Sequence, residues 1–260
     1  MTRTRRIWLV LSLTLGLLLP AAWAAAQHTE LKIKPKTAQK KDVGAKPASV
    51  VPVPRNDAWW QQRHKSMNER VAKGNVDLIL IGDSITHGWE GAGKDVWKEF
   101  YGNRNAVNLG IGGDQTQHVI WRLRNGNIDN IKPKLAVVMI GTNNAGSGNK
   151  PEEVAAGVKA VVKTLRTRLP ETKVLVLAIF PREAKPDGRL RQVNAKANEL
   201  IAKLADDKDV FYLDIGKKFL EPDDTLTKEI MPDLLHLSPK GYRIWAEAIE
   251  PMVAKFVGPK

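Results

Sequence analysis

Short apolar runs alternate with longer amphipathic stretches along most of this chain. A short apolar run that ends in a turn signal is typical of a buried strand in a parallel sheet. An apolar residue every three to four positions instead predicts a helix that packs one face against such a sheet. The alternation of the two patterns predicts an α/β fold with a doubly wound parallel sheet. The expected strands are residues 76–81, 106–109, 135–140, 173–179 and 210–213.

The expected helices fill the intervals between these strands. The first begins at Asp57, a good capping residue, and the last begins at Pro239 after the cap Ser238. Residues 90–102 are expected to form a loop, and residues 216–230 are rich in loop signals. The first helix should run to Lys73 and carry Trp59, Trp60, His64, Met67 and Val71 on one face. The other helices are expected at 116–124, 151–168 and 189–206.

The first 26 residues follow a different pattern. Three arginines precede an apolar run over residues 7–19, and small residues follow it. A basic start, a short apolar core and an Ala-x-Ala site are typical of a secretory signal peptide, and the run is short for a transmembrane helix. Cleavage after Ala24 or after Ala26 fits this pattern, and an uncleaved anchor is the alternative. The signal predicts an exported bacterial protein, periplasmic or extracellular, without stable membrane insertion after cleavage.

The next segment, residues 27–55, is rich in Lys, Ala, Pro and Val and has no amphipathic period. Such a composition favours a flexible linker that does not pack. The chain has 260 residues with 43% hydrophobic content, enough for one sizeable core. We therefore expect a signal peptide over residues 1–26, a linker over residues 27–55 and a single folded domain over residues 56–260.

The net charge of +13 is unevenly distributed. Residues 1–50 hold nine Lys and Arg against two acidic residues, a net of +7, which leaves +6 for the rest of the chain. No dense basic patch with interleaved aromatic residues follows, so we expect no nucleic-acid partner. The basic balance favours a solvated surface that could also help attraction to polyanionic envelope material. The absence of cysteine excludes disulfides, thiolate nucleophiles and cysteine-bound metals.

Polar residues and glycines follow three of the expected strands. The first strand runs into Gly82-Asp83-Ser84, the second is followed by Gly113, and the third by Asn143. Parallel strands end at one edge of a sheet, where the sites of open α/β sheets form. Ser84 therefore lies where chemistry is expected. Serine is also an ordinary helix cap, which is the structural alternative for Ser84.

A loop before the last helix contains Asp233 and His236. A serine hydrolase needs a nucleophile, a base, an acid that orients the base, and donors for the oxyanion. Ser84 is the candidate nucleophile, His236 the base and Asp233 the orienting acid. The backbone N–H groups of Ser84 and Gly113 and the side-chain amide of Asn143 are the candidate oxyanion donors. The order Ser, Asp, His and the lack of a Gly-x-Ser-x-Gly elbow differ from the α/β-hydrolase, chymotrypsin and subtilisin patterns.

Other sites are disfavoured by spacing. The glycines at residues 110–113 do not fit a dinucleotide-binding fingerprint, and no Gly-Lys-Ser/Thr follows them as in a P-loop. No His-x₃-His or carboxylate cluster indicates a metal site. Asp214 is the main alternative to Asp233 as the acid that orients the base, although no histidine lies three residues after Asp214.

Four short blocks resemble the SGNH (GDSL) serine hydrolase superfamily, in the same order. They are Gly82-Asp83-Ser84, Gly113, residues 141–144 and residues 233–236. Residues 108–123, 131–134 and 181–198 also resemble the catalytic subunits of the intracellular platelet-activating-factor acetylhydrolase. The resemblance extends over roughly residues 57–256 and implies a flavodoxin-like three-layer αβα sandwich with a five-stranded parallel sheet. It further implies no metal, no organic cofactor, and the roles given above for Ser84, Gly113, Asn143, Asp233 and His236.

The resemblance does not identify the substrate of this chain. The export signal is unlike the intracellular subunits, and residues 85–89 are similar to bacterial members. We therefore expect an exported esterase for short-chain acyl esters, acetyl above all, of a carbohydrate or a lipid. The alternatives are a non-catalytic module that binds a glycan or a partner, and a transacylase. The related subunits dimerise, so a homodimer of this chain is one possible assembly.

Several further polar and aromatic residues lie near these blocks. Candidates to line the substrate site are His87, Asn144 and Arg182. For Asn144, bracing of the Asn143 loop is the alternative, and His87 can simply be solvated. Asp83, through bonds to backbone groups of the turn, and His118 are expected to be structural. Trp89 and Trp121 are expected to pack rather than to stack on a sugar.

Overall fold

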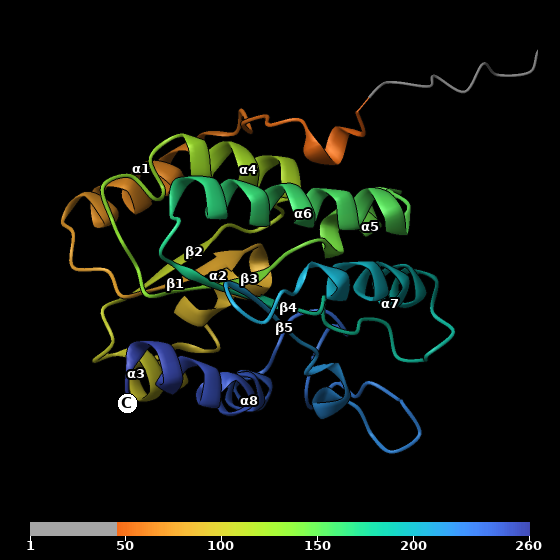
Figure 1. Ribbon diagram of the computed structural model, residues 1–260. Coiled ribbons are helices and arrows are strands. Elements are labelled where there is room, and N and C mark those ends of the chain that lie inside the picture. The colour runs from red at the N-terminus through yellow and green to blue at the C-terminus, as the bar shows by residue number, and fades with distance from the viewer. Residues whose placement is uncertain (1–45) are drawn as a thin grey trace, which may run out of the picture. The chain divides into compact units, whose positions relative to one another are not determined.

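The computed structural model describes residues 46–260, and the expected signal peptide and most of the expected linker lie outside these residues. Five parallel strands form one sheet in the order β2-β1-β3-β4-β5, with helices on both faces (Figure 1). The α/β prediction with a doubly wound parallel sheet is confirmed. The strands are β1 (Leu78–Gly82), β2 (Ala106–Gly110), β3 (Leu135–Met139), β4 (Lys173–Leu177) and β5 (Val210–Leu213).

Strand β1 is central and pairs with β2 on one side and β3 on the other. Its side chains alternate between two cores. Ile79 and Ile81 lie in one core and Leu78 and Leu80 in the other, and all four are completely buried. Burial on both faces explains why this strand is apolar without interruption. It also places the residue after the strand at the middle of the carboxyl edge.

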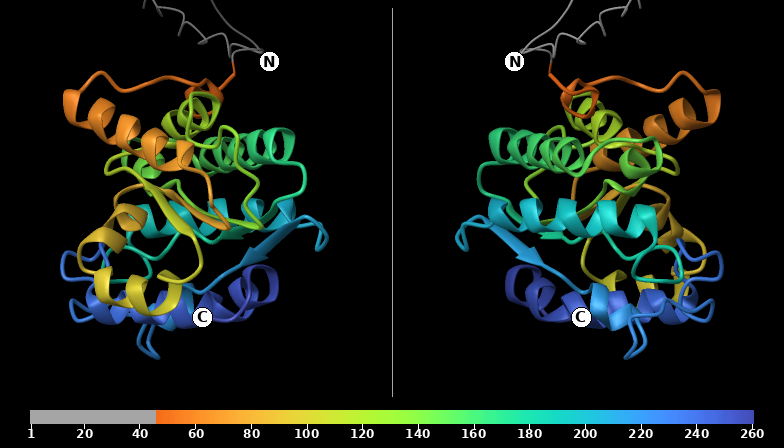
Figure 2. Two further views of the ribbon diagram at one scale, coloured as in Figure 1. Left: turned by 90° about the vertical axis from the view of Figure 1, so that its left-hand side faces the viewer. Right: turned by 90° about the vertical axis from the view of Figure 1, so that its right-hand side faces the viewer.

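Two helical layers cover the sheet, as the two side views in Figure 2 show. Residues of α1, α4, α6 and α7 contribute to the core on one face, and α3 and α8 contribute to the core on the other. The longer helices are α1 (Ala58–Ala72), α3 (Lys94–Tyr101), α4 (Thr116–Arg124), α6 (Pro151–Arg168), α7 (Arg189–Ile201) and α8 (Pro239–Val257). The short elements are η1 (Ala48–Val50), α2 (Ser84–His87), η2 (Gly88–Glu90), α5 (Thr142–Gly146), η3 (Ala202–Leu204) and η4 (Gly216–Phe219).

The prediction of a loop over residues 90–102 was wrong, because most of this segment forms α3. Val96 and Phe100 lie four residues apart and are buried together with Tyr101 against the α8 side of the sheet. Tertiary burial therefore stabilises a helix whose sequence also contains polar residues. The helix expected to reach Asp206 ends earlier, at Ile201, and continues as the short η3.

The described part of the chain begins inside the segment expected to be a linker. There Ser49 is fully buried, and its hydroxyl donates to the Glu153 carbonyl of α6 over 2.6 Å. The Thr116 hydroxyl in turn donates to the Ser49 carbonyl over 2.8 Å. Residues 48–55 therefore contact the domain through buried hydrogen bonds. No helix among residues 46–260 is long and apolar enough to cross a membrane.

Candidate active site

Ser84 lies at the carboxyl end of the central strand, as the first residue of α2. A Cβ on Gly82 would collide with the Met139 carbonyl of β3, so only glycine fits where the chain leaves the strand. Asp83 follows and is completely buried, with its Oδ1 accepting from the Ile85 N–H over 3.0 Å. The buried carboxyl thus holds the turn, as expected for Asp83, and leaves the Ser84 side chain partly exposed.

His236 and Asp233 reach Ser84 from the loop before α8. His236 Nε2 lies 2.8 Å from Ser84 Oγ, and His236 Nδ1 lies 2.6 Å from Asp233 Oδ2. A carboxylate only accepts hydrogen bonds, so Nδ1 carries the proton and Nε2 is left to accept from the Ser84 hydroxyl. The three side chains therefore form one chain of hydrogen bonds from carboxylate to hydroxyl.

The backbone of this loop holds Asp233 in place. Asp233 Oδ1 accepts from the backbone N–H groups of Leu235, over 3.1 Å, and His236, over 2.7 Å. Leu234 adopts a φ of 61°, a left-handed conformation that is strained for leucine and turns the chain between the two side chains. Partial burial acts to raise the Asp233 pKa, but hydrogen bonds from His236 outweigh it, so that the pKa lies below its usual value. Asp233 is therefore an anion at neutral pH.

Two backbone N–H groups near Ser84 are free to bind a substrate. No described residue accepts a hydrogen bond from the N–H of Ser84 or of Gly113. Gly113 is exposed and has a φ of 77°, which favours glycine. The Asn143 amide donates one N–H to the Asp114 carbonyl over 2.9 Å, which orients the amide and leaves its second N–H available. The sequence predicts these three groups as oxyanion donors, and that role stays a prediction.

The three residues expected to line the substrate site are placed differently from one another. His87 is partly exposed, and its Nδ1 lies 4.0 Å from the position that a Cβ on Gly112 would occupy. Ser84 Cβ lies 3.8 Å from the same position, so His87 and Ser84 flank one backbone segment. Arg182 is partly exposed and donates to the Thr142 hydroxyl over 3.1 Å.

Asn144 does not line the site, since it is completely buried. Its Oδ1 accepts from the Thr116 N–H, and its amide donates to Gln117 and Asn149. The lining role is therefore wrong and the bracing role fits, because the side chain ties the turn after β3 to α4.

The residues that were expected to have structural roles bond to turns and helix starts or pack in the core. His118 Nδ1 accepts from the Gln115 N–H over 3.0 Å at the start of α4. Asp214 is exposed and accepts from the Gly216 N–H over 2.7 Å, so its hydrogen bond serves a turn after β5. Trp89 is buried in the core, and Trp121 packs on Trp60. No group of three metal-binding side chains occurs among residues 46–260.

Sequence reasoning missed two side chains beside the site. Trp59 was expected on the packed face of α1, but 51% of its surface is exposed and its ring stacks on His87, with ring centres 5.8 Å apart. Arg55 was assigned to the linker, yet its Nη1 donates to the Gly112 carbonyl over 2.6 Å. The signal that could have found Trp59 is the tryptophan pair, because only one of two adjacent helical residues can point into the core.

A buried polar cluster supports the loop that carries Gly113. Asp114 is fully buried; its Oδ2 accepts from Arg122 Nε over 2.8 Å and its Oδ1 from Trp60 Nε1 over 2.7 Å. Arg122, also fully buried, donates to Asn127 over 2.6 Å and to the Gly82 carbonyl over 3.3 Å. The cluster thus joins α1, α4 and the end of β1 directly behind Ser84.

A serine, a histidine and a carboxylate bonded in series at the strand ends of an α/β sheet form the arrangement found in serine hydrolases. The GDSL-like Lipase/Acylhydrolase family matches residues 80–244. The platelet-activating factor acetylhydrolase IB subunit alpha2 of Rattus norvegicus is 41% identical over 191 residues, which cover 72% of this chain and 80% of that protein. The alpha1 subunit of Bos taurus is 36% identical over 214 residues, covering 82% of this chain and 90% of that protein.

Solved structures of distant relatives share the fold. A GDSL-like lipase from Bacteroides thetaiotaomicron superimposes with a TM-score of 0.61 at 19% identity, covering 75% of this chain and 97% of that one. Axe2, an acetylxylan esterase from Geobacillus stearothermophilus, gives a TM-score of 0.55 at 18% identity, covering 72% and 96%. The chain belongs to the GDSL-like lipase/acylhydrolase family, within the SGNH superfamily and close to the platelet-activating-factor acetylhydrolase subunits. It is a carboxylic ester hydrolase.

Proposed function

We propose that the protein hydrolyses short-chain acyl esters, acetyl esters above all, through Ser84, His236 and Asp233. The observation that carries the proposal is the series of hydrogen bonds from Asp233 Oδ2 to His236 Nδ1, over 2.6 Å, and from His236 Nε2 to Ser84 Oγ, over 2.8 Å. Both distances lie in the range that general-base catalysis needs. The relatives named acetylhydrolase support the acetyl group.

The proposed reaction has two halves. Ser84 Oγ attacks the carbonyl carbon while His236 Nε2 takes the hydroxyl proton, and the alcohol leaves with that proton as the acyl-enzyme forms. Water then attacks the acyl carbon, His236 again takes and returns a proton, and the acid is released from Ser84. Asp233 stabilises the imidazolium in both halves. The free N–H groups of Ser84, Gly113 and Asn143 donate to the oxyanion.

For the alcohol part of the ester, we favour a carbohydrate. The exposed ring of Trp59 and the ring of His87 stack next to Gly112 and Ser84, which offers a flat aromatic wall beside polar groups. Such a wall suits the apolar face of a sugar ring.

The test compares wild type with Ser84→Ala on p-nitrophenyl acetate. Loss of the nucleophile should lower kcat by about 1,000-fold or more. Ser66→Ala is the matched control, because Ser66 lies exposed on α1 and its hydroxyl bonds only the Arg63 carbonyl. Equal activity of wild type and Ser84→Ala would contradict the mechanism.

A substrate series separates the finer alternatives. Acyl chains from C2 to C12, with acetylated xylan alongside, should show a preference for acetyl and for the sugar ester. Retention of a glycan without any turnover would instead indicate a binding module. Transfer of the acetyl group to a sugar in preference to water would indicate a transacylase.

We further propose that the protein is exported, periplasmic or extracellular, on the basis of the signal pattern in residues 1–26. The mature protein should then begin after Ala24 or Ala26. Intact-mass measurement of the protein recovered outside the cytoplasm checks this. A chain that keeps Met1 and stays in the cytoplasm would contradict export.

A further inference from the structure

The N-terminal arm, residues 48–63, lies outside the segment matched by the family and contacts the loop of Gly113. Two arginines of the arm donate to carbonyls of this loop. Arg55 Nη1 donates to the Gly112 carbonyl over 2.6 Å, and Arg63 Nε donates to the Gly110 carbonyl over 2.8 Å. The arm therefore holds the loop at two carbonyl groups that are two residues apart.

The Gly112 carbonyl and the Gly113 N–H belong to one peptide group. A trans peptide is planar, and its C=O and N–H point in opposite directions. Arg55 therefore holds one end of the peptide group whose other end is the free Gly113 N–H. The peptide lies beside the nucleophile, since a Cβ on Gly112 would lie 3.8 Å from Ser84 Cβ. Rotation of this peptide would move the N–H away from the oxyanion.

Arg55 is itself fixed in direction. Its Nε donates to Asp57 Oδ2 over 3.1 Å, and Asp57 Oδ1 accepts from the Trp60 N–H at the start of α1. Arg55 Nη1 also lies 3.5 Å from Asp114 Oδ1, and only 26% of the side chain is exposed. A cation that bonds to an amide carbonyl also polarises the amide, which makes its N–H a stronger donor.

We propose that Arg55 is a positioning residue of the oxyanion hole, which holds the Gly112–Gly113 peptide so that the Gly113 N–H points at the developing oxyanion. The inference rests on the proposed hydrolytic function of Ser84. It adds a residue from outside the family match to the reaction, although Arg55 itself does not contact the substrate.

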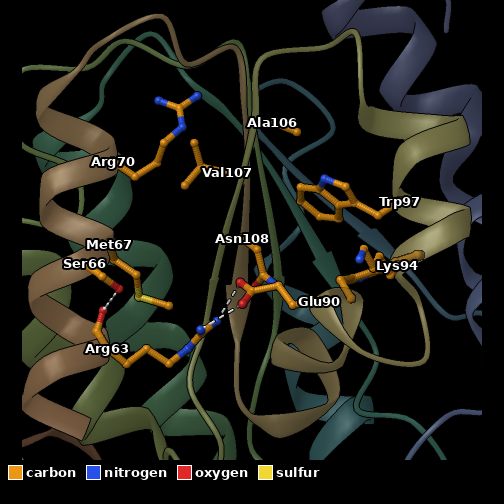
Figure 3. A pocket seen from close by; sticks show the side chains of 11 residues that line it. Arg63, Ser66, Met67, Arg70, Glu90, Lys94, Trp97, Ala106, Val107 and Asn108 are labelled. Carbon is orange, nitrogen blue, oxygen red and sulfur yellow. Dashed lines mark hydrogen bonds and ion pairs between the residues drawn. The ribbon is translucent and has the colours of Figure 1, made fainter. Parts of the chain in front are cut away.

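Arg63 is a matched control within the same arm. The N–H of the peptide that Arg63 holds is that of Ile111, and it already donates to the Gly82 carbonyl over 3.3 Å. Arg63 also pairs with Glu90 over 2.8 Å beside Asn108 of β2, as Figure 3 shows. Loss of Arg63 therefore removes contacts of the loop and of the arm without freeing an oxyanion donor.

The experiment measures kcat and KM on p-nitrophenyl acetate and the unfolding temperature of Arg55→Met, Arg55→Lys and Arg63→Met. Arg55→Met should lower kcat by about 10-fold, less than deletion of a whole oxyanion donor, with KM within about twofold. Arg55→Lys, which keeps the charge and one donor, should retain an intermediate kcat. Arg63→Met should keep kcat within about twofold of wild type even where its unfolding temperature falls. Added guanidinium chloride at millimolar concentration should raise the kcat of Arg55→Met and leave Arg63→Met unchanged.

Three results would overturn the inference. The first is an unchanged kcat in Arg55→Met. The second is an equal loss of kcat in Arg55→Met and Arg63→Met that follows their unfolding temperatures and does not respond to guanidinium, which would make Arg55 merely structural. The third is a wild type without activity on any ester, which would refute the proposed function itself. The wild-type assay alone distinguishes this result from the other two.

Discussion

At the scale of single residues, two adjacent positions at the end of β1 have separate tasks. Ser84 faces the open site and bonds to His236, whereas Asp83 is turned inward, without access to solvent, and bonds to the Ile85 N–H. The second carboxyl oxygen of Asp83 has no hydrogen-bond partner among the described residues. A buried carboxyl in this position is more stable when protonated.

The pH dependence of stability should reveal Asp83. Burial, with the charge of Asp114 in addition, raises the pKa of Asp83 to about 7, although the Ile85 N–H and His236 act in the opposite direction. The ordinary value in an unfolded chain is about 3.9, so the folded state binds the proton more tightly. Folding stability is therefore expected to fall as the pH rises from about 4 to about 7, and to change little above that range on account of this group.

Asp83→Asn should remove this slope, because the amide mimics the protonated acid. The free energies of unfolding of wild type and variant, measured in denaturant at several pH values, should diverge by about 3 kcal/mol between pH 4 and 7, with the variant relatively more stable at pH 7. Asp214→Asn, at an exposed carboxylate, is the control. Parallel pH curves for wild type and Asp83→Asn would contradict the prediction.

At the scale of elements, α1, α4 and the end of β1 meet in the polar cluster of Asp114 and Arg122. Arg122 donates to Asp114, Asn127 and the Gly82 carbonyl, and is completely buried. Removal of one partner from such a pair leaves an uncompensated buried charge. The cluster therefore holds the elements in register behind Ser84.

Arg122→Met is expected to lower the free energy of unfolding by about 3–5 kcal/mol. The same change at Arg124, an exposed arginine two residues further along α4, should have an effect within about 0.5 kcal/mol. Denaturant unfolding of the two variants checks this comparison. Similar losses in both would show that helix propensity, and not the buried cluster, accounts for the effect.

The elements also show where sequence patterns are informative. The strands were predicted within a few residues, because burial on both faces leaves a continuous apolar run. Helix α3 was missed although its apolar residues at 96, 97, 100 and 101 recur at helical spacing, because the segment is short and has glycines on both sides, which favoured a loop. The contact of Arg55 with Gly112 joins residues 57 positions apart, and no local pattern carries such information.

At the scale of the whole molecule, the candidate site is assembled from distant segments. Ser84, Gly113 and Asn143 were predicted because parallel strands end at one edge, and Asp233 and His236 because their spacing fits a base and its orienting acid. Arg55 and Trp59 were not, since they belong to an arm whose composition indicated a linker. The signal peptide and the homodimer remain predictions.

The hydrogen bond between Ser84 and His236 joins residues 152 positions apart. Closing so long a loop is entropically unfavourable until the intervening sheet has formed, so contacts of this range develop late in folding. A chain still emerging from a ribosome contains Ser84, the proposed nucleophile, long before it contains His236, the proposed base. If Ser84 is the nucleophile proposed above, hydrolysis is expected to begin only when nearly the entire domain is complete, so that a partly folded chain would leave the esters around it untouched.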